Sequence, residues 1–247
     1  MVFWRCFIAS GFIALLAYGC SYGANSSTEN TKEVVQEINV SQLFIKAKAS
    51  QKAGDLFAQG NYFLDTQRYQ EALGSYNKAI ALEPNRADVW INRGNALTSL
   101  QRYQDALISY NNAIAINSHK DEAWYNRGNA LTSLQRYQDA IVSYDKAIAI
   151  KKDKPEAWVN RGIALTKLRR FKEALLSYDE AIALKPNKHE AYYNKACSYA
   201  LQSNIELAIE NLQKAIQLAP KKYQQLAKTD PDLNKIRNDK RFQELIK

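Results

Sequence analysis

Residues 124–150 read WYNRGNALTSLQRYQDAIVSYDKAIAI, and residues 90–116 carry nearly the same phrase, WINRGNALTSLQRYQDALISYNNAIAI. Trp90, Trp124 and Trp158 follow one another at intervals of 34 residues, and Tyr192 comes at the next interval. The same interval separates further columns of small and aromatic residues: Gly60, Gly94, Gly128 and Gly162; Ala72, Ala106, Ala140, Ala174 and Ala208; Tyr76, Tyr110, Tyr144 and Tyr178. A fixed period of this length indicates a repeat architecture, not a single globular core.

The residue types in one repeat explain why it recurs. In residues 121–154, Trp124, Gly128 and Leu131 share one helical face. After a turn at 134–136, a second helical stripe contains Tyr137, Ala140, Ile141, Tyr144 and Ile148. A single helix pair cannot bury both of its faces, so each unit needs a neighbour.

The period of 34 and the order Trp, Gly, Ala, Tyr, Ala, Pro resemble the tetratricopeptide repeat. The resemblance implies an all-α fold, an α-solenoid in which antiparallel helix pairs form a right-handed superhelix. It covers residues 41–222, with units at 53–86, 87–120, 121–154, 155–188 and 189–222. The charged tail contains apolar residues that could cover the last apolar face, and they predict C-terminal capping helices over residues 223–247: Leu226, Leu233, Ile236, Phe242, Leu245 and Ile246.

Residues 1–20, MVFWRCFIASGFIALLAYGC, differ from the repeats. One cation (Arg5) precedes an apolar run that is short for a bilayer span, which predicts a signal peptide or a membrane anchor. The small residues before Cys20 resemble the lipobox of bacterial lipoproteins and imply lipidation of Cys20, although Tyr18 departs from that pattern. Plain secretion and an uncleaved anchor remain open alternatives. Residues 21–40 are polar and predict a flexible linker, so we expect an exported or membrane-anchored protein of the bacterial envelope.

Polar columns predict the functional surface. In the tetratricopeptide family the first helix of each pair lines a concave groove, and three columns fall there: Asn92, Asn126, Asn160 and Asn194; Asn61, Asn95 and Asn129; Thr98, Thr132 and Thr166. Amide side chains both donate and accept, so such a row can pair with the main chain of an extended peptide. It resembles the asparagine ladder of O-GlcNAc transferases. In the alternative interpretation, these asparagines only tolerate solvent or persist through recent duplication.

An acidic column accompanies the asparagines: Asp88, Glu122, Glu156 and Glu190. On the groove edge these acids favour a basic or neutral ligand, but acids in a first helical turn also offset the helix dipole. The carboxylate clamp of chaperone-binding members is excluded, since its cations are replaced by Ile91, Glu156 and Asn160. Another column, Arg93, Arg127 and Arg161, is expected to pack its stems between helices with the charged heads extending into solvent.

Catalytic patterns are missing from the sequence. It contains no HExxH, CxxC, GxSxG or phosphate-loop glycine motif, and the two histidines, His119 and His189, lie near turns between units. Cys197 falls in a groove column and is expected to pack, not to react. We therefore expect no enzyme, no cofactor and no metal site.

The predicted function is a non-catalytic scaffold that binds an extended peptide or partner protein in its groove and helps to assemble an envelope complex. Two alternatives remain: a self-associating structural protein, and a basic surface that binds anionic lipid or nucleic acid. The net charge of +9 permits the second alternative, but an export signal argues against nucleic acid. The identity of the partner and the oligomeric state stay open.

Overall fold

A computed structural model describes residues 40–247, which form one compact unit. The predicted signal or anchor at 1–20, including Cys20, and residues 21–39 of the predicted linker lie outside the described residues. From Val40 to Lys247 the chain forms twelve α-helices and one short 3-10 helix, without a strand. The all-α prediction is confirmed. None of the described helices is long and apolar enough to cross a membrane.

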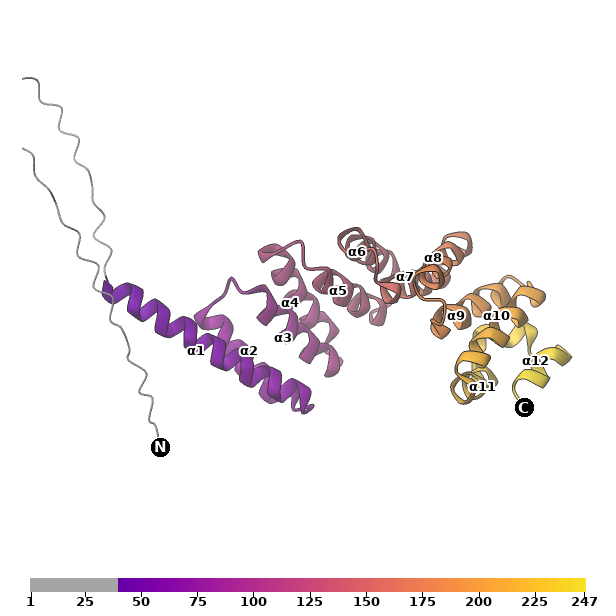
Figure 1. Cartoon of the computed structure of the whole chain (residues 1–247), viewed down its shortest axis with the longest axis horizontal. Helices are drawn as coiled ribbons and strands as arrows, with labels where there is room; N and C mark the ends of the chain where they lie inside the picture. Colours follow the sequence, from indigo (N-terminus) through magenta and orange to yellow (C-terminus); the bar gives the residue numbers. More distant parts are fainter. Residues whose placement is uncertain (1–39) are drawn as a thin grey trace, which may run out of the picture. The chain divides into compact units, whose positions relative to one another are not determined.

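The helices form pairs, and each repeat contributes a first and a second helix. The first helices are α1 (Val40–Asp65), α3 (Ala87–Ser99), α5 (Asp121–Ser133), α7 (Pro155–Lys167) and α9 (His189–Leu201). The second helices are α2 (Tyr69–Leu82), α4 (Tyr103–Ile116), α6 (Tyr137–Ile150), α8 (Phe171–Leu184) and α10 (Ile205–Leu218). Each first helix packs on the second helix of its own repeat, and from α3 onward also on that of the preceding repeat. Figure 1 shows the pairs following one another in chain order, as in an α-solenoid.

A tight turn joins the two helices of every repeat. One residue of each turn has a left-handed backbone with φ near +60°: Gln67, Gln101, Gln135, Arg169 and Ser203. In the third repeat the N–H of Gln135 donates to the carbonyl of Thr132 (2.9 Å), and the N–H of Arg136 to that of Leu131 (2.8 Å). These bonds satisfy carbonyls at the end of α5 and reverse the chain.

The core of a repeat depends on a glycine and a tyrosine. Tyr144 is fully buried, and a Cβ on Gly128 would lie only 2.5 Å from its Cε1 atom. Glycine therefore makes room for the ring. In the fifth repeat Ala196 replaces the glycine and Leu212 replaces the tyrosine, so the two positions change together.

The chain after the fifth repeat forms α11 (Pro220–Thr229), the 3-10 helix η1 (Pro231–Ile236) and α12 (Lys240–Leu245). Leu233, Ile236 and Phe242 are fully buried against α9 and α10, and Leu245 and Ile246 are partly buried there. Leu226, which is predicted to join them, is instead 42% exposed. The prediction of C-terminal caps is confirmed, with one of them a 3-10 helix. Asp230 begins that helix by accepting a hydrogen bond from the N–H of Asp232.

Candidate functional site

The predicted asparagine columns lie beside one another and form hydrogen bonds between repeats. Nδ2 of Asn126 donates to Oδ1 of Asn95 across 2.8 Å. The same bond joins two further pairs: Asn92 to Asn61 (2.8 Å) and Asn160 to Asn129 (2.9 Å). We call these three pairs the asparagine ladder. Its side chains are half-buried, so the column predicted to bind a peptide also joins each repeat to the next.

A tyrosine from the second helix supports each rung of the asparagine ladder. The hydroxyl of Tyr110 donates to Oδ1 of Asn95 (2.9 Å) and lies 3.1 Å from Oγ1 of Thr98. Burial raises the pKa of Tyr110, so its hydroxyl stays protonated and remains a donor. In the next repeat Tyr144 bonds Asn129 and Thr132 in the same way. The predicted threonines therefore position the tyrosines.

The asparagine ladder ends after α7. Asn194 would need an acceptor at the position of Ile163, whose side chain has none. Its Nδ2 donates instead to the main-chain carbonyl of Glu190 in its own helix (2.7 Å). Thr166 is buried here and bonds the hydroxyl of Tyr178 (3.0 Å). The four predicted asparagines of the first column thus form three rungs, not four.

Two matching pockets lie along the asparagine ladder. The first, of about 310 Å³, is lined by Asn95, Thr98, Ser99, Tyr110, Asn126 and Asn129. The second, of about 230 Å³, is lined by Asn129, Thr132, Ser133, Tyr144, Asn160 and Ile163. Within the described residues, no hydrogen bond engages Nδ2 of Asn95 or Oδ1 of Asn126. The first pocket therefore offers an amide donor and an amide acceptor, which suit the C=O and N–H groups of an extended chain.

The chain itself occupies the place where a third pocket would lie, one repeat beyond the second. Lys167 of α7 and Cys197 of α9 would contribute to its walls. Oδ2 of Asp232 lies 3.0 Å from Nζ of Lys167. Oδ2 of Asp230 lies 3.8 Å from Sγ of Cys197 and accepts a hydrogen bond from the Tyr193 hydroxyl at 2.7 Å. We call the surface that carries the asparagine ladder and its two pockets the polar face. The C-terminal cap closes this end of it.

The predicted acidic column is largely paired with lysines. Nζ of Lys120 lies 2.7 Å from a carboxylate oxygen of Asp88, and Nζ of Lys188 lies 2.8 Å from one of Glu156. Burial opposes ionisation of Glu156, but the hydrogen bond from Lys188 and further favourable interactions outweigh it and hold the pKa of Glu156 below its usual value. All four acids also lie in the first turn of their helices, as the helix-dipole interpretation requires. The partners had a sequence signal of their own, because the lysines recur every 34 residues: Lys120, Lys154, Lys188 and Lys222.

Glu122 differs from the other acids. No ion pair involves its carboxylate within residues 40–247, and its side chain is exposed. It lines a pocket of about 230 Å³ together with Phe57, Asp88, Ile91 and Asn92. This end of the polar face therefore keeps a net negative charge.

The arginine column differs from its prediction. Nε of Arg127 donates to Oδ1 of Asn111 (2.8 Å), and its Nη1 donates to Oγ of Ser143 (2.5 Å). Asn111 belongs to α4 and Ser143 to α6, so the guanidinium on α5 bridges the second helices of two repeats. Two further arginines repeat the arrangement: Arg93 with Asn77 and Ser109, and Arg161 with Asp145 and Ser177. The expectation of solvent-extended heads is wrong, because acceptors on both neighbouring helices hold them.

The candidate catalytic residues do not come together. Cys197 is buried, and burial raises the pKa of its thiol, which suppresses the reactive thiolate. Nδ1 of His189 lies 2.7 Å from the hydroxyl of Tyr223 in α11, whereas His119 is exposed between α4 and α5. In the part of the chain that the structure describes, no cluster of His, Cys, Asp and Glu could hold a metal ion.

Three family models match the chain. One described as a tetratricopeptide repeat matches residues 57–121, and another of that description matches 155–188 and 189–222. A third, described as a TPR repeat, matches residues 128–169. No curated protein sequence matches the chain.

Solved structures share the fold. MamA from Desulfovibrio magneticus RS-1 is 19% identical with a TM-score of 0.65, over 69% of this chain and 96% of that chain. YrrB, described as a TPR protein with an unusual peptide-binding site, is 24% identical with a TM-score of 0.62, over 74% and 93%. PilW, described as a widely conserved type IV pilus biogenesis factor, is 20% identical with a TM-score of 0.68, over 78% and 90%. The columns of 34-residue spacing, the serial helix pairs and these matches agree: the chain belongs to the tetratricopeptide repeat family.

Proposed function

We propose that the chain is a non-catalytic scaffold that binds an extended segment of a partner protein along the asparagine ladder. The observation that carries the proposal is the first pocket, where Nδ2 of Asn95 and Oδ1 of Asn126 form no hydrogen bond within the described residues. These groups lie where main-chain amides of a ligand can reach them. YrrB, which has a similar fold, is described as having a peptide-binding site, and this supports a peptide as ligand.

The charges along the polar face favour a direction and a composition for that segment. Asp88 and Glu122 line the pocket at the α3 end, and among the described residues only Asp88 of these two acids has a lysine partner. The two ladder pockets are lined by neutral polar side chains, apart from Ile163. The cap closes the other end at Asp230 and Asp232. A segment with neutral residues in the ladder pockets and a basic residue near Glu122 fits this pattern.

The test blocks the pockets without removing any rung of the asparagine ladder. Ser99 and Ser133 are exposed and each lines one pocket, and the equivalent residue of the fourth repeat is Lys167. The double variant Ser99→Lys/Ser133→Lys therefore fills the pockets with a side chain that the fold already accommodates. Gln70→Lys/Gln104→Lys is the matched control, because these exposed residues line neither pocket.

Peptides selected from a displayed random library on the immobilised full chain would be measured against both variants. Loss of binding in the serine variant alone supports the proposal. Equal binding to both variants, or selection of no peptide at all, would argue against it.

The scaffold is further proposed to act in the bacterial envelope, exported or anchored through residues 1–20, where it helps to assemble a complex. The apolar run and the lipobox-like residues before Cys20 support this location. Metabolic labelling with a fatty acid, compared between wild type and Cys20→Ser, tests the lipoprotein form. Label that persists in the variant, or its absence from both chains, would contradict lipidation at this cysteine.

Self-association is a second candidate, favoured by one observation. Ile108, Val142 and Leu176 occupy the same place in three successive second helices, and their side chains are 58%, 48% and 66% exposed. Such a stripe can bury apolar surface against a second copy. Light scattering measures the molar mass of the wild type and of Val142→Lys/Leu176→Lys. If the stripe mediates self-association, the wild type should have a mass larger than that of one chain, and the variant should have the mass of one chain. A monomeric wild type would exclude this candidate.

A further inference from the structure

The fourth repeat carries a cationic turn that the others lack. Residues 167–172 read KLRRFK, whereas the equivalent residues of the second and third repeats both read SLQRYQ (99–104 and 133–138). Three neutral residues are thus replaced by Lys167, Arg169 and Lys172, next to an arginine that all three repeats share. The three substitutions lie at the junction of α7 and α8: Lys167 ends α7, Arg169 is in the turn, and Lys172 is in the first turn of α8.

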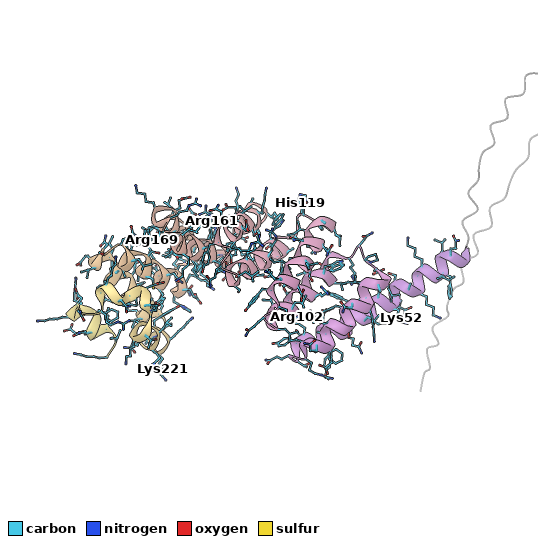
Figure 2. All side chains as sticks on the ribbon, turned by 180° about the vertical axis from the view of Figure 1, so that it is seen from behind. Lys52, Arg102, His119, Arg161, Arg169 and Lys221 are labelled. Carbon is cyan, nitrogen blue, oxygen red and sulfur yellow. The ribbon has the colours of Figure 1, made fainter. Side chains whose placement is uncertain are left out.

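The structure leaves two of these cations unpaired. Arg169 and Lys172 are exposed, and within the described residues neither side chain forms an ion pair or a hydrogen bond. Lys167 pairs with Asp232 (3.0 Å), and Arg170 pairs with Glu173 (2.7 Å). Figure 2 shows Arg169 at the surface of the array.

The unpaired cations surround a concavity. A pocket of about 400 Å³ is lined by Arg169, Arg170, Phe171, Lys172, Glu173 and Gln202. The half-buried Phe171 ring gives it an apolar wall. Neighbouring turns do not neutralise it, since their acids already have partners: Asp139 pairs with Arg136, and Glu206 pairs with Arg241.

We propose that this turn binds an acidic segment of a partner protein, at a surface separate from the asparagine ladder. Two carboxylates of the chain already meet the cluster: Asp232 on Lys167 and Glu173 on Arg170. These two pairs neutralise Lys167 and Arg170, so Arg169 and Lys172 are the cations that remain for the carboxylates of a ligand. A membrane or a nucleic acid draws on cations spread over a wide surface, whereas Arg169 and Lys172 line a single pocket of about 400 Å³. A short run of Asp or Glu matches that extent.

The test uses fluorescein-labelled octaglutamate, with octaglutamine as the uncharged peptide, and measures anisotropy with the full chain. The variant Arg169→Gln/Lys172→Gln converts both residues to those of the third repeat and keeps the Lys167–Asp232 pair. It should fold, because Gln135 and Arg169 share the same left-handed backbone (φ 59°). Lys151→Gln/Lys185→Gln removes two exposed cations from other loops and gives the same net charge.

Octaglutamate should bind the variant about fivefold more weakly than wild type or the charge-matched control, and added salt should weaken wild-type binding. In the variant, the further changes Gln101→Arg/Gln104→Lys should restore affinity by rebuilding the turn in the second repeat. If both charge-reduced variants lost affinity for octaglutamate equally, the effect would be due to net charge alone, and the proposal would be overturned. Undetectable binding of octaglutamate to the wild type would also overturn the proposal. The same holds if Arg169→Gln/Lys172→Gln weakens binding to phosphatidylglycerol vesicles or to a single-stranded oligonucleotide more than it weakens binding to the peptide.

Discussion

Nδ2 of Asn126 lies 2.8 Å from Oδ1 of Asn95, so one pair of side chains both lines the candidate binding pocket and joins the third repeat to the second. Replacing either asparagine by alanine therefore changes stability as well as the binding surface. For this reason the binding test above fills the pockets and leaves the asparagine ladder intact.

The Asn95–Asn126 bond should appear as a coupling in urea unfolding. A double-mutant cycle with Asn95→Ala and Asn126→Ala should give a coupling free energy of about 0.5–1.5 kcal/mol, as for one ordinary intramolecular hydrogen bond. Asn194→Ala is the control, because within residues 40–247 the Asn194 side chain bonds only the main-chain carbonyl of Glu190 in its own helix. It should destabilise the chain less than Asn126→Ala does. A coupling indistinguishable from zero would show that the rung contributes nothing to stability.

Gly128→Ala should destabilise the chain, because the new Cβ would lie 2.5 Å from Cε1 of the buried Tyr144. We expect a loss of about 1–3 kcal/mol from overpacking. Gly74→Ala is the matched control: its Cβ would have nothing within 4 Å. It should stabilise α2 by about 0.5–1 kcal/mol through helix propensity. Both values come from chemical denaturation.

The fifth repeat suggests how to rescue that variant. Because Ala196 and Leu212 occur there together, Gly128→Ala/Tyr144→Leu should be more stable than the sum of the two single changes predicts. Simple additivity would mean that the glycine is not there to accommodate the ring.

The Glu156–Lys188 pair should make a small, pH-dependent contribution. The pKa of Glu156 is lowered in the folded chain. Its contribution to the stability of the fold is therefore complete at pH values above the ordinary pKa of 4.5, and it is lost as the pH falls through the pKa of the folded state. The pKa of Lys188 is raised, so its contribution is lost only as pH rises through a value above 10.5. Because the Glu156 side chain is 44% exposed, the pair should contribute less than about 1 kcal/mol.

Lys188→Met leaves the burial of Glu156 but removes its hydrogen bond, so the pKa of Glu156 should rise. Carboxyl-carbon NMR titration measures the shift, with the exposed Lys151→Met as the control. An unchanged Glu156 pKa in Lys188→Met would contradict the assigned cause.

Cys197 should be unreactive in the folded chain. Cys197 is 4% exposed, its Sγ lies beside Asp230, and burial raises the pKa of its thiol. In a chain with Cys6→Ser and Cys20→Ser, iodoacetamide at pH 8 should modify Cys197 at least about a hundredfold more slowly than in urea, since labelling requires local opening. Rapid native labelling would show that the cap does not cover this cysteine in solution.

The sequence by itself determined the fold, because each repeat obeys the same packing requirement. Tyr144 needs Gly128, and both need the next helix pair, so these residue types return every 34 positions. The apolar residues Leu233 and Phe242 likewise indicated a cap, since the last repeat exposes an apolar face that water would otherwise meet. Periodicity reports which positions share an environment, and that suffices for fold class and helix pairing.

Only the tertiary structure decided the partners of the polar columns. Asn126 and Asn95 belong to different columns 31 residues apart, and their pairing depends on how adjacent first helices pack. The guanidinium of Arg127 could reach water or a neighbouring helix, and the positions of Asn111 and Ser143 settled the choice. The turn at Asp230 lies after the last repeat and has no equivalent in the 34-residue columns. No column could therefore predict that this turn lies beside Lys167 and Cys197. The 34-residue period indicates which positions are buried in every repeat. A hydrogen bond, by contrast, needs two atoms within about 3 Å of each other, and that distance is fixed only when the repeats are stacked.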